Sequence, residues 1–129
     1  MKDKGLRKSI VNILVVEDDR NFGTILRREL EEDKYAVDVV SDGVEAVLSF
    51  IDKNYDFVLL DIKIPKLDGI NTLKIIKKLN PEVPAITFSG NVGSIEMADS
   101  IRVGAEKCLI KPFEIRKLRD DIKKYGSNP

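Results

Sequence analysis

Short apolar runs that alternate with amphipathic stretches are the feature that most constrains how this chain folds. Five such runs occur, at residues 13–16, 36–40, 57–60, 85–88 and 108–110. Several of them are continuously apolar, which is typical of strands in a parallel sheet that is covered on both faces. The run at 36–40 contains Asp38 among its valines, and this alternation favours a strand at the edge of the sheet.

The stretches between these runs have the spacing of amphipathic helices, in which apolar residues three or four apart share one face. The predicted faces are Phe22, Ile25, Leu26 and Leu30; Val44, Val47, Leu48 and Ile51; Ile70, Leu73, Ile76 and Leu79; Ile95, Ala98 and Ile101; and Ile115, Leu118, Ile122 and Tyr125. A strand–helix unit that occurs five times predicts an α/β fold, a doubly wound parallel sheet with five strands and five flanking helices.

Capping residues mark several of the expected helix ends. Asp19, Asp42 and Ser94 stand where the first, second and fourth helices should begin, and their side chains can accept hydrogen bonds from free backbone N–H groups. Gly104 is expected to stop the fourth helix, because glycine readily adopts the backbone conformation that ends a helix.

Length and composition limit the possible function classes. The 129 residues accommodate one domain, which we place at residues 10–125, with flexible tails at 1–9 and 126–129. Lys+Arg and Asp+Glu both number 22, so a domain-wide basic field for nucleic acid is excluded. The chain has no histidine and a single cysteine, Cys108, which excludes an internal disulfide, a Cys/His metal cluster and histidine-dependent nucleophilic catalysis. No apolar run approaches the roughly 18–20 residues of a membrane span and no secretory signal is evident, so we expect a cytoplasmic protein.

Polar residues follow four of the five predicted strands. Glu17-Asp18-Asp19 follows the first strand, Asp61 the third, Ser89-Gly90 the fourth and Lys111-Pro112 the fifth. Taken singly, each is most simply explained as a helix cap, a turn residue or a solvated loop residue. The carboxyl ends of parallel strands, however, meet at one edge of the sheet, where ligands bind in open α/β folds. We therefore expect these side chains to lie close together.

Gathered carboxylates repel one another, and their pKa values rise unless a positive charge keeps them ionised. Mg²⁺ with oxygen ligands would supply such a charge, as would Lys111. Carboxylates, a hydroxyl group and a lysine, without a general-base histidine, suit phosphoryl transfer, which depends chiefly on positioning and charge neutralisation. Asp61 follows the most continuously apolar run, which we expect at the sheet centre, and is the best candidate for a nucleophile that becomes an aspartyl phosphate. Glu17 and Asp18 would hold the metal.

Four motifs at these positions resemble the receiver domains of bacterial two-component response regulators. In chain order they are ILVVEDD at 13–19, DIKIPKLDG at 61–69, ITFSG at 86–90, and Gly104-Ala105 together with Lys111-Pro112-Phe113. The resemblance covers roughly residues 10–125, and the chain is similar to the single-domain regulators of chemotaxis. The resemblance implies a flavodoxin-like fold with strand order 2-1-3-4-5.

The resemblance also implies roles for the acidic residues. Asp61 would accept a phosphoryl group from a phosphohistidine on a sensor histidine kinase or a histidine phosphotransfer protein. Mg²⁺ would be bound by Glu17, Asp18, Asp61 and the backbone carbonyl of Lys63. The domain would then be a phosphorylation-controlled switch that catalyses its own phosphoryl transfer and slow dephosphorylation.

Further roles follow from the same resemblance. Lys111 would pair with Asp61 and then with the phosphoryl group, and Ser89 would turn towards a phosphoryl oxygen. The Lys111–Pro112 peptide bond is expected to be cis. Downstream partners, and the second subunit of a possible homodimer, would bind the face made by the fourth helix, fifth strand and fifth helix, at residues 95–102, 106–110 and 115–124.

Four residues depart from the usual pattern of the family or tune its behaviour. Cys108 stands where the family usually has an aromatic ring, and we expect it to pack as a small buried residue rather than to act as a redox sensor. Lys63 and Asn91 each lie two residues beyond a site residue, where the family tunes the lifetime of the phosphate. Gly90 stands where the family usually has alanine, which keeps access to the site open. We hypothesise a long-lived phosphoryl group.

Two other functions compete with the switch. The first is a phosphatase or hydrolase with an aspartyl nucleophile, but such enzymes commonly carry a second acid at the position of Lys63. The second is a flavodoxin-like ligand-binding domain, but no Gly-rich phosphate-binding loop follows the first strand. The sequence identifies neither the kinase nor the output, and it leaves open whether the chain works alone or belongs to a longer regulator.

Overall fold

The computed structural model describes residues 10–90 and 93–126, which form one parallel sheet with helices on both sides. The strands are β1 (Asn12–Val16), β2 (Ala36–Val40), β3 (Phe57–Asp61), β4 (Ala85–Ser89) and β5 (Lys107–Ile110). The helices are α1 (Arg20–Glu32), α2 (Gly43–Asp52), α3 (Gly69–Leu79), α4 (Ser94–Arg102) and α5 (Ile115–Gly126). The strand order is β2-β1-β3-β4-β5, with β3 at the centre and β2 at an edge. The predicted doubly wound fold is confirmed.

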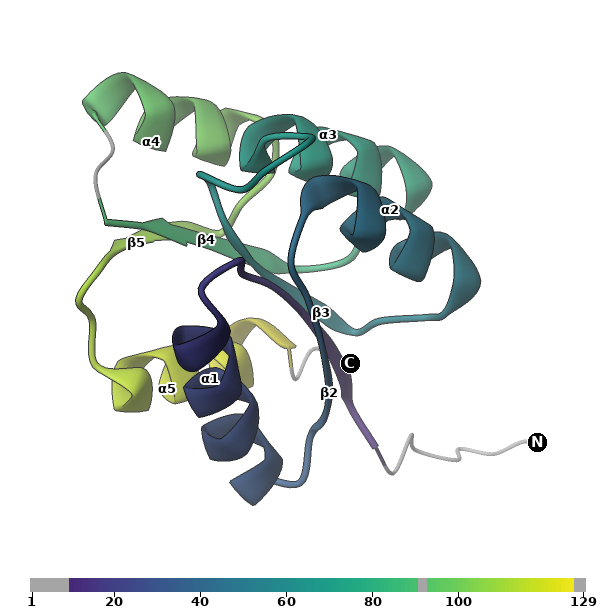
Figure 1. The fold of residues 1–129 in the computed structure, drawn as a ribbon, viewed down its shortest axis with the longest axis vertical. Helices are drawn as coiled ribbons and strands as arrows, with labels where there is room; N and C mark the ends of the chain where they lie inside the picture. The colour runs from purple at the N-terminus through teal and green to yellow at the C-terminus, as the bar shows by residue number, and fades with distance from the viewer. Residues whose placement is uncertain (1–9, 91–92, 127–129) are drawn as a thin grey trace.

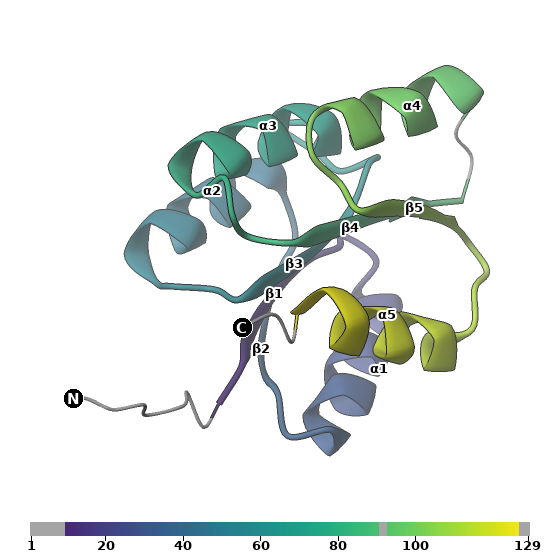
Figure 2. The same cartoon turned by 180° about the vertical axis from the view of Figure 1, so that it is seen from behind.

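The helices form two layers. Helices α2, α3 and α4 cover one face of the sheet, and α1 and α5 cover the other (Figures 1 and 2). Successive side chains of a strand point to opposite faces, so the sheet separates two apolar cores. The core under α2 and α3 includes Leu14, Val58, Leu60, Leu73 and Ile76. The core under α1 and α5 includes Ile13, Leu26, Leu59, Phe88 and Leu118.

The prediction of which face the second helix buries was wrong. In α2 the core side chains are Ala46 and Phe50, whereas Val44, Leu48 and Ile51 are 45%, 57% and 60% exposed. The helix is apolar on more than one side, so spacing alone does not determine which side is buried.

The start of α2 explains its rotation. A side chain at Gly43 would place its Cβ 2.1 Å from the backbone oxygen of Leu67 and 2.3 Å from the hydroxyl of Thr72. This first turn is therefore pressed against the loop that precedes α3, and glycine is needed for the close approach. The contact turns Ala46 and Phe50 towards the sheet and leaves the other apolar stripe outside.

The apolar face predicted for the fourth helix also lies outward. Ile95 and Ile101 are exposed, and the buried side chain of α4 is Ser100. Its hydroxyl forms a buried hydrogen bond with the hydroxyl of Thr87 in β4. A polar pair thus occupies the contact between α4 and the sheet, which apolar spacing cannot reveal.

Two of the three predicted helix caps are present. Asp19 and Asp42 cap α1 and α2 as predicted. The prediction that Ser94 caps α4 was wrong, because Gly93 is the N-cap and Ser94 is the first helical residue. The backbone N–H of Gly93 donates to Glu96 Oε1 at 3.1 Å, so a side chain of the first turn satisfies this helix end instead.

The remaining boundaries concern the ends of α4 and of the domain. Gly104 follows the end of α4 with φ +122°, in the region that favours glycine, as predicted. Gly126, which the prediction assigned to a tail, is the last residue of α5. Residues 1–9 and 127–129 lie outside the described residues, so the domain bounds stay a prediction.

Within residues 10–90 and 93–126, no helix has the length and apolar character that crossing a membrane requires.

Candidate functional site

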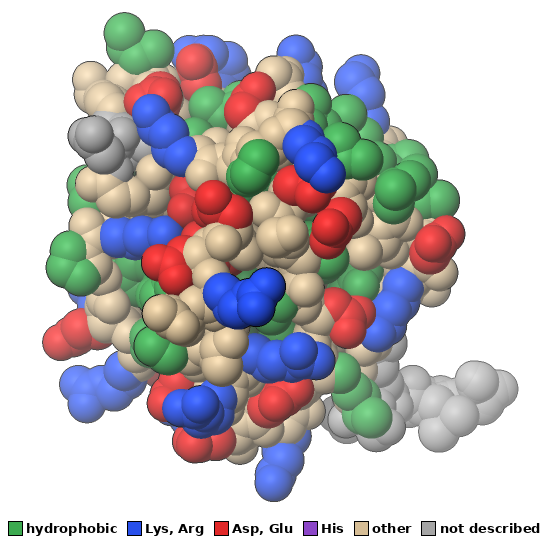
Figure 3. Space-filling view, viewed as in Figure 1, with side chains coloured by type: hydrophobic (Ala, Val, Ile, Leu, Met, Phe, Trp, Pro, Cys, Tyr) green, Lys and Arg blue, Asp and Glu red, His purple; other side chains and the backbone are tan. Residues whose placement is uncertain are grey.

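The carboxyl edge of the sheet brings together side chains from distant parts of the chain. Glu17 directly follows β1, and Asp61 is the last residue of β3. Carboxylate oxygens of Glu17, Asp18 and Asp61 lie within 4.8 Å of one another. Glu17 and Asp61 are buried, whereas Asp18 is exposed. Figure 3 shows acidic side chains gathered on this side of the molecule. We call Glu17, Asp18 and Asp61 the acidic edge.

Lys111 bridges two members of the acidic edge. It follows β5, and its Nζ lies 2.9 Å from Glu17 Oε1 and 2.9 Å from Asp61 Oδ2. The ammonium also lies 4.7 Å from the ring centre of Phe22 and 5.4 Å from that of Phe88, where the ring faces attract a cation. The Lys111–Pro112 bond is cis, as the resemblance implied.

The electrostatics of the edge follow from burial. Burial raises the pKa of Glu17, and the nearby charge of Asp61 adds to this effect, although hydrogen bonds from Lys111 and from the backbone N–H of Asp19 oppose it. Burial alone would lower the pKa of Lys111, but its hydrogen bonds to Glu17 and Asp61 outweigh burial and raise it. Lys111 therefore stays protonated and positively charged.

The acidic edge has three carboxylates, and Lys111 pairs with two of them, Glu17 and Asp61. The edge therefore keeps an excess of negative charge when its groups are ionised. A hard divalent cation is the natural complement to such a set of oxygen donors, and Mg²⁺ in particular binds one or two carboxylates together with water and phosphate oxygens. The donor set of the acidic edge fits this ion.

Ser89 and Gly90 lie beside the acidic edge at the end of β4. Phe88 pairs in register with Asp61, so Ser89 lies one residue further along the neighbouring strand. Ser89 is buried, yet its hydroxyl has no hydrogen-bond partner among the residues that the structure describes. A Cβ added to Gly90 would meet only Lys111 Cβ, at 3.8 Å, so there is space at this position. Asn91 lies outside the described residues.

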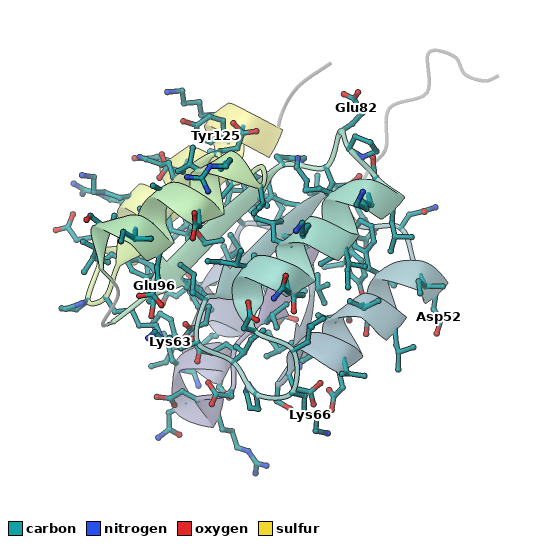
Figure 4. The ribbon with its side chains drawn as sticks, turned by 90° about the horizontal axis from the view of Figure 1, so that it is seen from above. Asp52, Lys63, Lys66, Glu82, Glu96 and Tyr125 are labelled. Carbon is teal, nitrogen blue, oxygen red and sulfur yellow. The ribbon has the colours of Figure 1, made fainter. Side chains whose placement is uncertain are left out.

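Lys63 connects the loop after β3 to α4. Its backbone N–H donates to Asp61 Oδ1 at 2.8 Å. Its ammonium lies 3.5 Å from Glu96 Oε2 on α4, and the two labelled side chains lie next to each other in Figure 4. The same glutamate accepts the Gly93 N–H with its other oxygen. An exposed ion pair thus joins the Asp61 loop to the first turn of α4.

Cys108 lies in β5 and pairs in register with Thr87 of β4. It is a free thiol of intermediate exposure, less buried than we expected for a small core residue. By strand alternation it lies on the α4 side of the sheet, next to the Thr87–Ser100 pair.

Several neighbours of the acidic edge carried no signal in the sequence. Glu96 and the Thr87–Ser100 pair are scattered single residues whose contacts only the fold creates. A hollow of about 680 Å³ beside Glu17 and Asp18 is also lined by Arg20 and Lys66. Helical spacing could have flagged Arg20 as the first residue of α1, but nothing in the sequence places Lys66 near it.

Comparison with known protein families now shows which family the chain belongs to. The family model of the response regulator receiver domain matches residues 13–123. The chain belongs to this family. Response regulator receiver domains are phosphorylation-controlled switches of two-component systems.

Curated relatives support the same family. The chain is 37% identical over 109 residues to the transcriptional regulatory protein ZraR of Klebsiella oxytoca, which covers 84% of this chain and 25% of that protein. It is 37% identical over 111 residues to the CpxR homolog of Haemophilus influenzae, which covers 86% of this chain and 48% of that protein. The chain thus spans between a quarter and about half the length of these relatives.

Solved receiver structures share the fold over nearly their whole length. The receiver domain of Francisella response regulator 1452 has a TM-score of 0.84 at 30% identity and covers 91% of this chain and 97% of that one. The receiver domain of the sensor histidine kinase PA1611 from Pseudomonas aeruginosa has a TM-score of 0.84 at 28% identity, covering 93% of this chain and 100% of that one. That structure holds a magnesium ion coordinated in its active-site cleft.

Proposed function

We propose that Asp61 is the phosphoacceptor of this receiver domain and that a phosphohistidine of a sensor kinase or phosphotransfer protein is the donor. The observation that carries this proposal is the arrangement of Asp61 with Glu17, Asp18 and Lys111 at one edge of the sheet. An Asp61 carboxylate oxygen attacks phosphorus, the bond between phosphorus and the histidine nitrogen breaks, and the imidazole leaves with the electron pair. The product is an aspartyl phosphate.

Mg²⁺ would be held by Glu17, Asp18, Asp61 and the backbone carbonyl of Lys63. When bound, the ion neutralises charge that develops on the phosphoryl oxygens. The magnesium ion in the PA1611 receiver supports this assignment, because the donor set here is of the same chemical kind that the ion prefers.

The chain's own residues position the reaction. Lys111 holds Asp61 Oδ2 before the reaction and pairs with a phosphoryl oxygen afterwards. The Lys63 N–H holds Asp61 Oδ1, which directs the carboxylate. The buried hydroxyl of Ser89 can donate to a phosphoryl oxygen, because no described residue forms a hydrogen bond with it. Slow attack of water on the aspartyl phosphate would reset the switch, at a rate tuned by Lys63, Gly90 and Asn91.

The output follows from the neighbours of Ser89. Movement of Ser89 would shift α4 and β5 between two arrangements, and downstream partners would bind the face of α4, β5 and α5. The beryllofluoride-activated receiver domain of NtrC4, 28% identical to this chain, is a dimer, which supports self-association in the active state as one outcome.

The test is phosphorylation with a small donor. Incubation with acetyl phosphate and Mg²⁺ should place one acid-stable, base-labile phosphate on the chain. Label should be absent from Asp61→Ala and unchanged in Glu82→Gln, a control at an exposed acid far from the edge. Label should also disappear when the divalent cation is chelated. Label that persists in Asp61→Ala would show that another residue is the acceptor.

A further inference from the structure

Helices α2 and α3 expose a strip of large apolar side chains that the acidic edge does not use. The strip consists of Val44, Leu48 and Ile51 on α2 and Ile75 and Leu79 on α3, and we call it the α2–α3 patch. Ile51 and Leu79 line one hollow at the ends of the two helices, so the two halves of the patch are contiguous. Hydrophobic side chains gather over this part of the surface in Figure 3.

A patch of this kind indicates an interface. Single exposed apolar residues are normal, but a contiguous strip with a charged rim typically marks a surface that another protein covers. Val44, Leu48 and Ile51 recur three or four residues apart and so share one face of α2, and the buried Ala46 and Phe50 form a second apolar side. One of these sides meets the sheet, and the other has no cover among the described residues.

The rim of the patch carries opposite charges on its two sides. Glu45 and Asp52 are exposed on α2, and Lys74 and Lys78 are exposed on α3. No ion pair joins these four side chains to any other described residue. Figure 4 shows Asp52 at the end of α2, directed away from α3. The apolar strip is therefore bordered by acid on the α2 side and by base on the α3 side.

We infer that the α2–α3 patch is the interface of a symmetric homodimer. Both helices connect strands of one parallel sheet, so they run in the same direction. A two-fold axis along the groove between them places α2 of one subunit over α3 of the other and keeps their direction. The acidic border then meets the basic border twice. Asp52 faces Lys78 of the partner subunit and Glu45 faces Lys74 of the partner subunit, while the apolar strips close on each other.

This dimer is separate from the proposed function. No residue of the patch or its rim belongs to the acidic edge, so the dimer should form without phosphate or magnesium. It should form equally in Asp61→Ala. A failure of the phosphorylation test would leave it unaffected, and a failure of the dimer test would leave phosphorylation unaffected.

The first experiment measures self-association by sedimentation equilibrium of the unphosphorylated chain. The wild type should be a dimer, and the double variant Leu48→Gln, Ile51→Gln should dimerise about a hundredfold more weakly, because two large apolar side chains lose their buried contacts. The matched control is Ile95→Gln, Ile110→Gln on the other exposed apolar surface, and it should dimerise like the wild type. A monomeric wild type, or equal losses in both double variants, would overturn the inference.

The second experiment tests the two-fold pairing of charges. Asp52→Lys alone and Lys78→Glu alone should each weaken the dimer by about tenfold, because like charges then face each other twice. An equimolar mixture of the two variants should restore wild-type affinity, since in a mixed dimer one of the two contacts pairs the new lysine with the new glutamate and the other keeps its native pair. Both substitutions lie on exposed positions, so the fold should persist, as circular dichroism would check. A mixture no stronger than the separate variants would exclude this arrangement.

Discussion

Two exposed apolar surfaces lie on the same side of the sheet: the α2–α3 patch, and the surface of α4 and β5 that includes Ile95 and Ile110. They are attached to the loop after Asp61 in different ways. On the α2–α3 side, the Gly69 N–H donates to the backbone oxygen of Ile62 at 2.8 Å, and the Gly43 N–H donates to that of Pro65 at 3.3 Å. Neither glycine has room for a side chain. This side is packed tightly against the loop that follows Asp61.

The α4 side is held more loosely. An exposed ion pair between Lys63 and Glu96 joins α4 to the loop, and a Cβ at Gly93 would meet nothing within 4 Å. A hydroxyl pair, Thr87 with Ser100, replaces an apolar contact beneath the helix. Exposure alone therefore does not distinguish a moving surface from a permanent one. The loosely attached surface suits a switch, and the tightly packed surface suits a standing interface.

The largest loss of stability should come from adding a side chain at Gly69, where α3 packs tightly against the loop after Asp61. In Gly69→Ala the new Cβ would lie 2.4 Å from the backbone oxygen of Asp61 and 2.6 Å from Ile62 Cα, and backbone cannot move aside cheaply. We expect the free energy of unfolding to fall by about 3 kcal/mol in urea denaturation. The matched change on the loose side, Gly93→Ala, should cost less than about 1 kcal/mol. Equal losses would remove the contrast between the two sides.

The next largest effect should come from Lys111, which links the ends of β1, β3 and β5 through Glu17 and Asp61. Lys111→Met removes both charge-assisted hydrogen bonds of a largely buried ammonium, and we expect a loss of about 2–3 kcal/mol without added metal. Asp61 should remain phosphorylatable, but amide NMR shifts in α4 and β5 should no longer respond to phosphorylation. The control Lys107→Met breaks a more exposed pair with Asp121 and should cost less than about 1 kcal/mol. A response preserved in Lys111→Met would show that the switch uses another route.

A smaller effect tests Tyr55, which lines the same hollow as Ile51 and Leu79 of the α2–α3 patch. The Tyr55 hydroxyl donates to Asp38 Oδ2 at 2.6 Å, and this bond, with help from Lys53, lowers the pKa of Asp38. Tyr55→Phe should cost about 1 kcal/mol at pH 7, a value reduced for the partial exposure of Asp38. A depressed pKa gives stability that is present above the unfolded pKa of about 3.9 and is lost as the pH falls through the folded value. The difference from wild type should therefore shrink in acid unfolding curves below about pH 4. A constant difference down to about pH 2 would contradict the assignment.

The smallest change in stability should come from the loose side. Lys63→Ala and Glu96→Gln each break the exposed ion pair and should alter the free energy of unfolding by less than about 0.5 kcal/mol. Lys63→Ala should nevertheless speed dephosphorylation of Asp61, because it removes the ammonium that we expect to shield the phosphoryl group. Loss of radiolabel from purified phosphorylated chain measures the rate. Equal rates in wild type and variant would refute the long-lived phosphate.

The grouping of the site residues follows from the sequence, whereas their exposure does not. The continuous apolar runs determine buried parallel strands, and the polar residues that follow them meet at one edge for a topological reason, since all strands end there. Glu17, Asp61 and Lys111 could therefore be grouped from the sequence alone. Cys108 marks the limit, because its residue type predicts burial, yet its place on β5, an edge strand of the sheet, leaves it partly exposed.

Local pattern determined the strands, the helices, most of the caps and the membership of the acidic edge, because each depends on neighbours along the chain or on strand order. Tertiary packing alone decided how each helix is rotated about its axis. Helix α2 has two apolar sides of the same period, and only the close approach of Gly43 to Leu67 selects the one that is buried. Helix α4 meets the sheet through Ser100, a contact whose partner lies 13 residues away on β4. The surfaces of this protein thus depend on packing between elements, which no local spacing encodes.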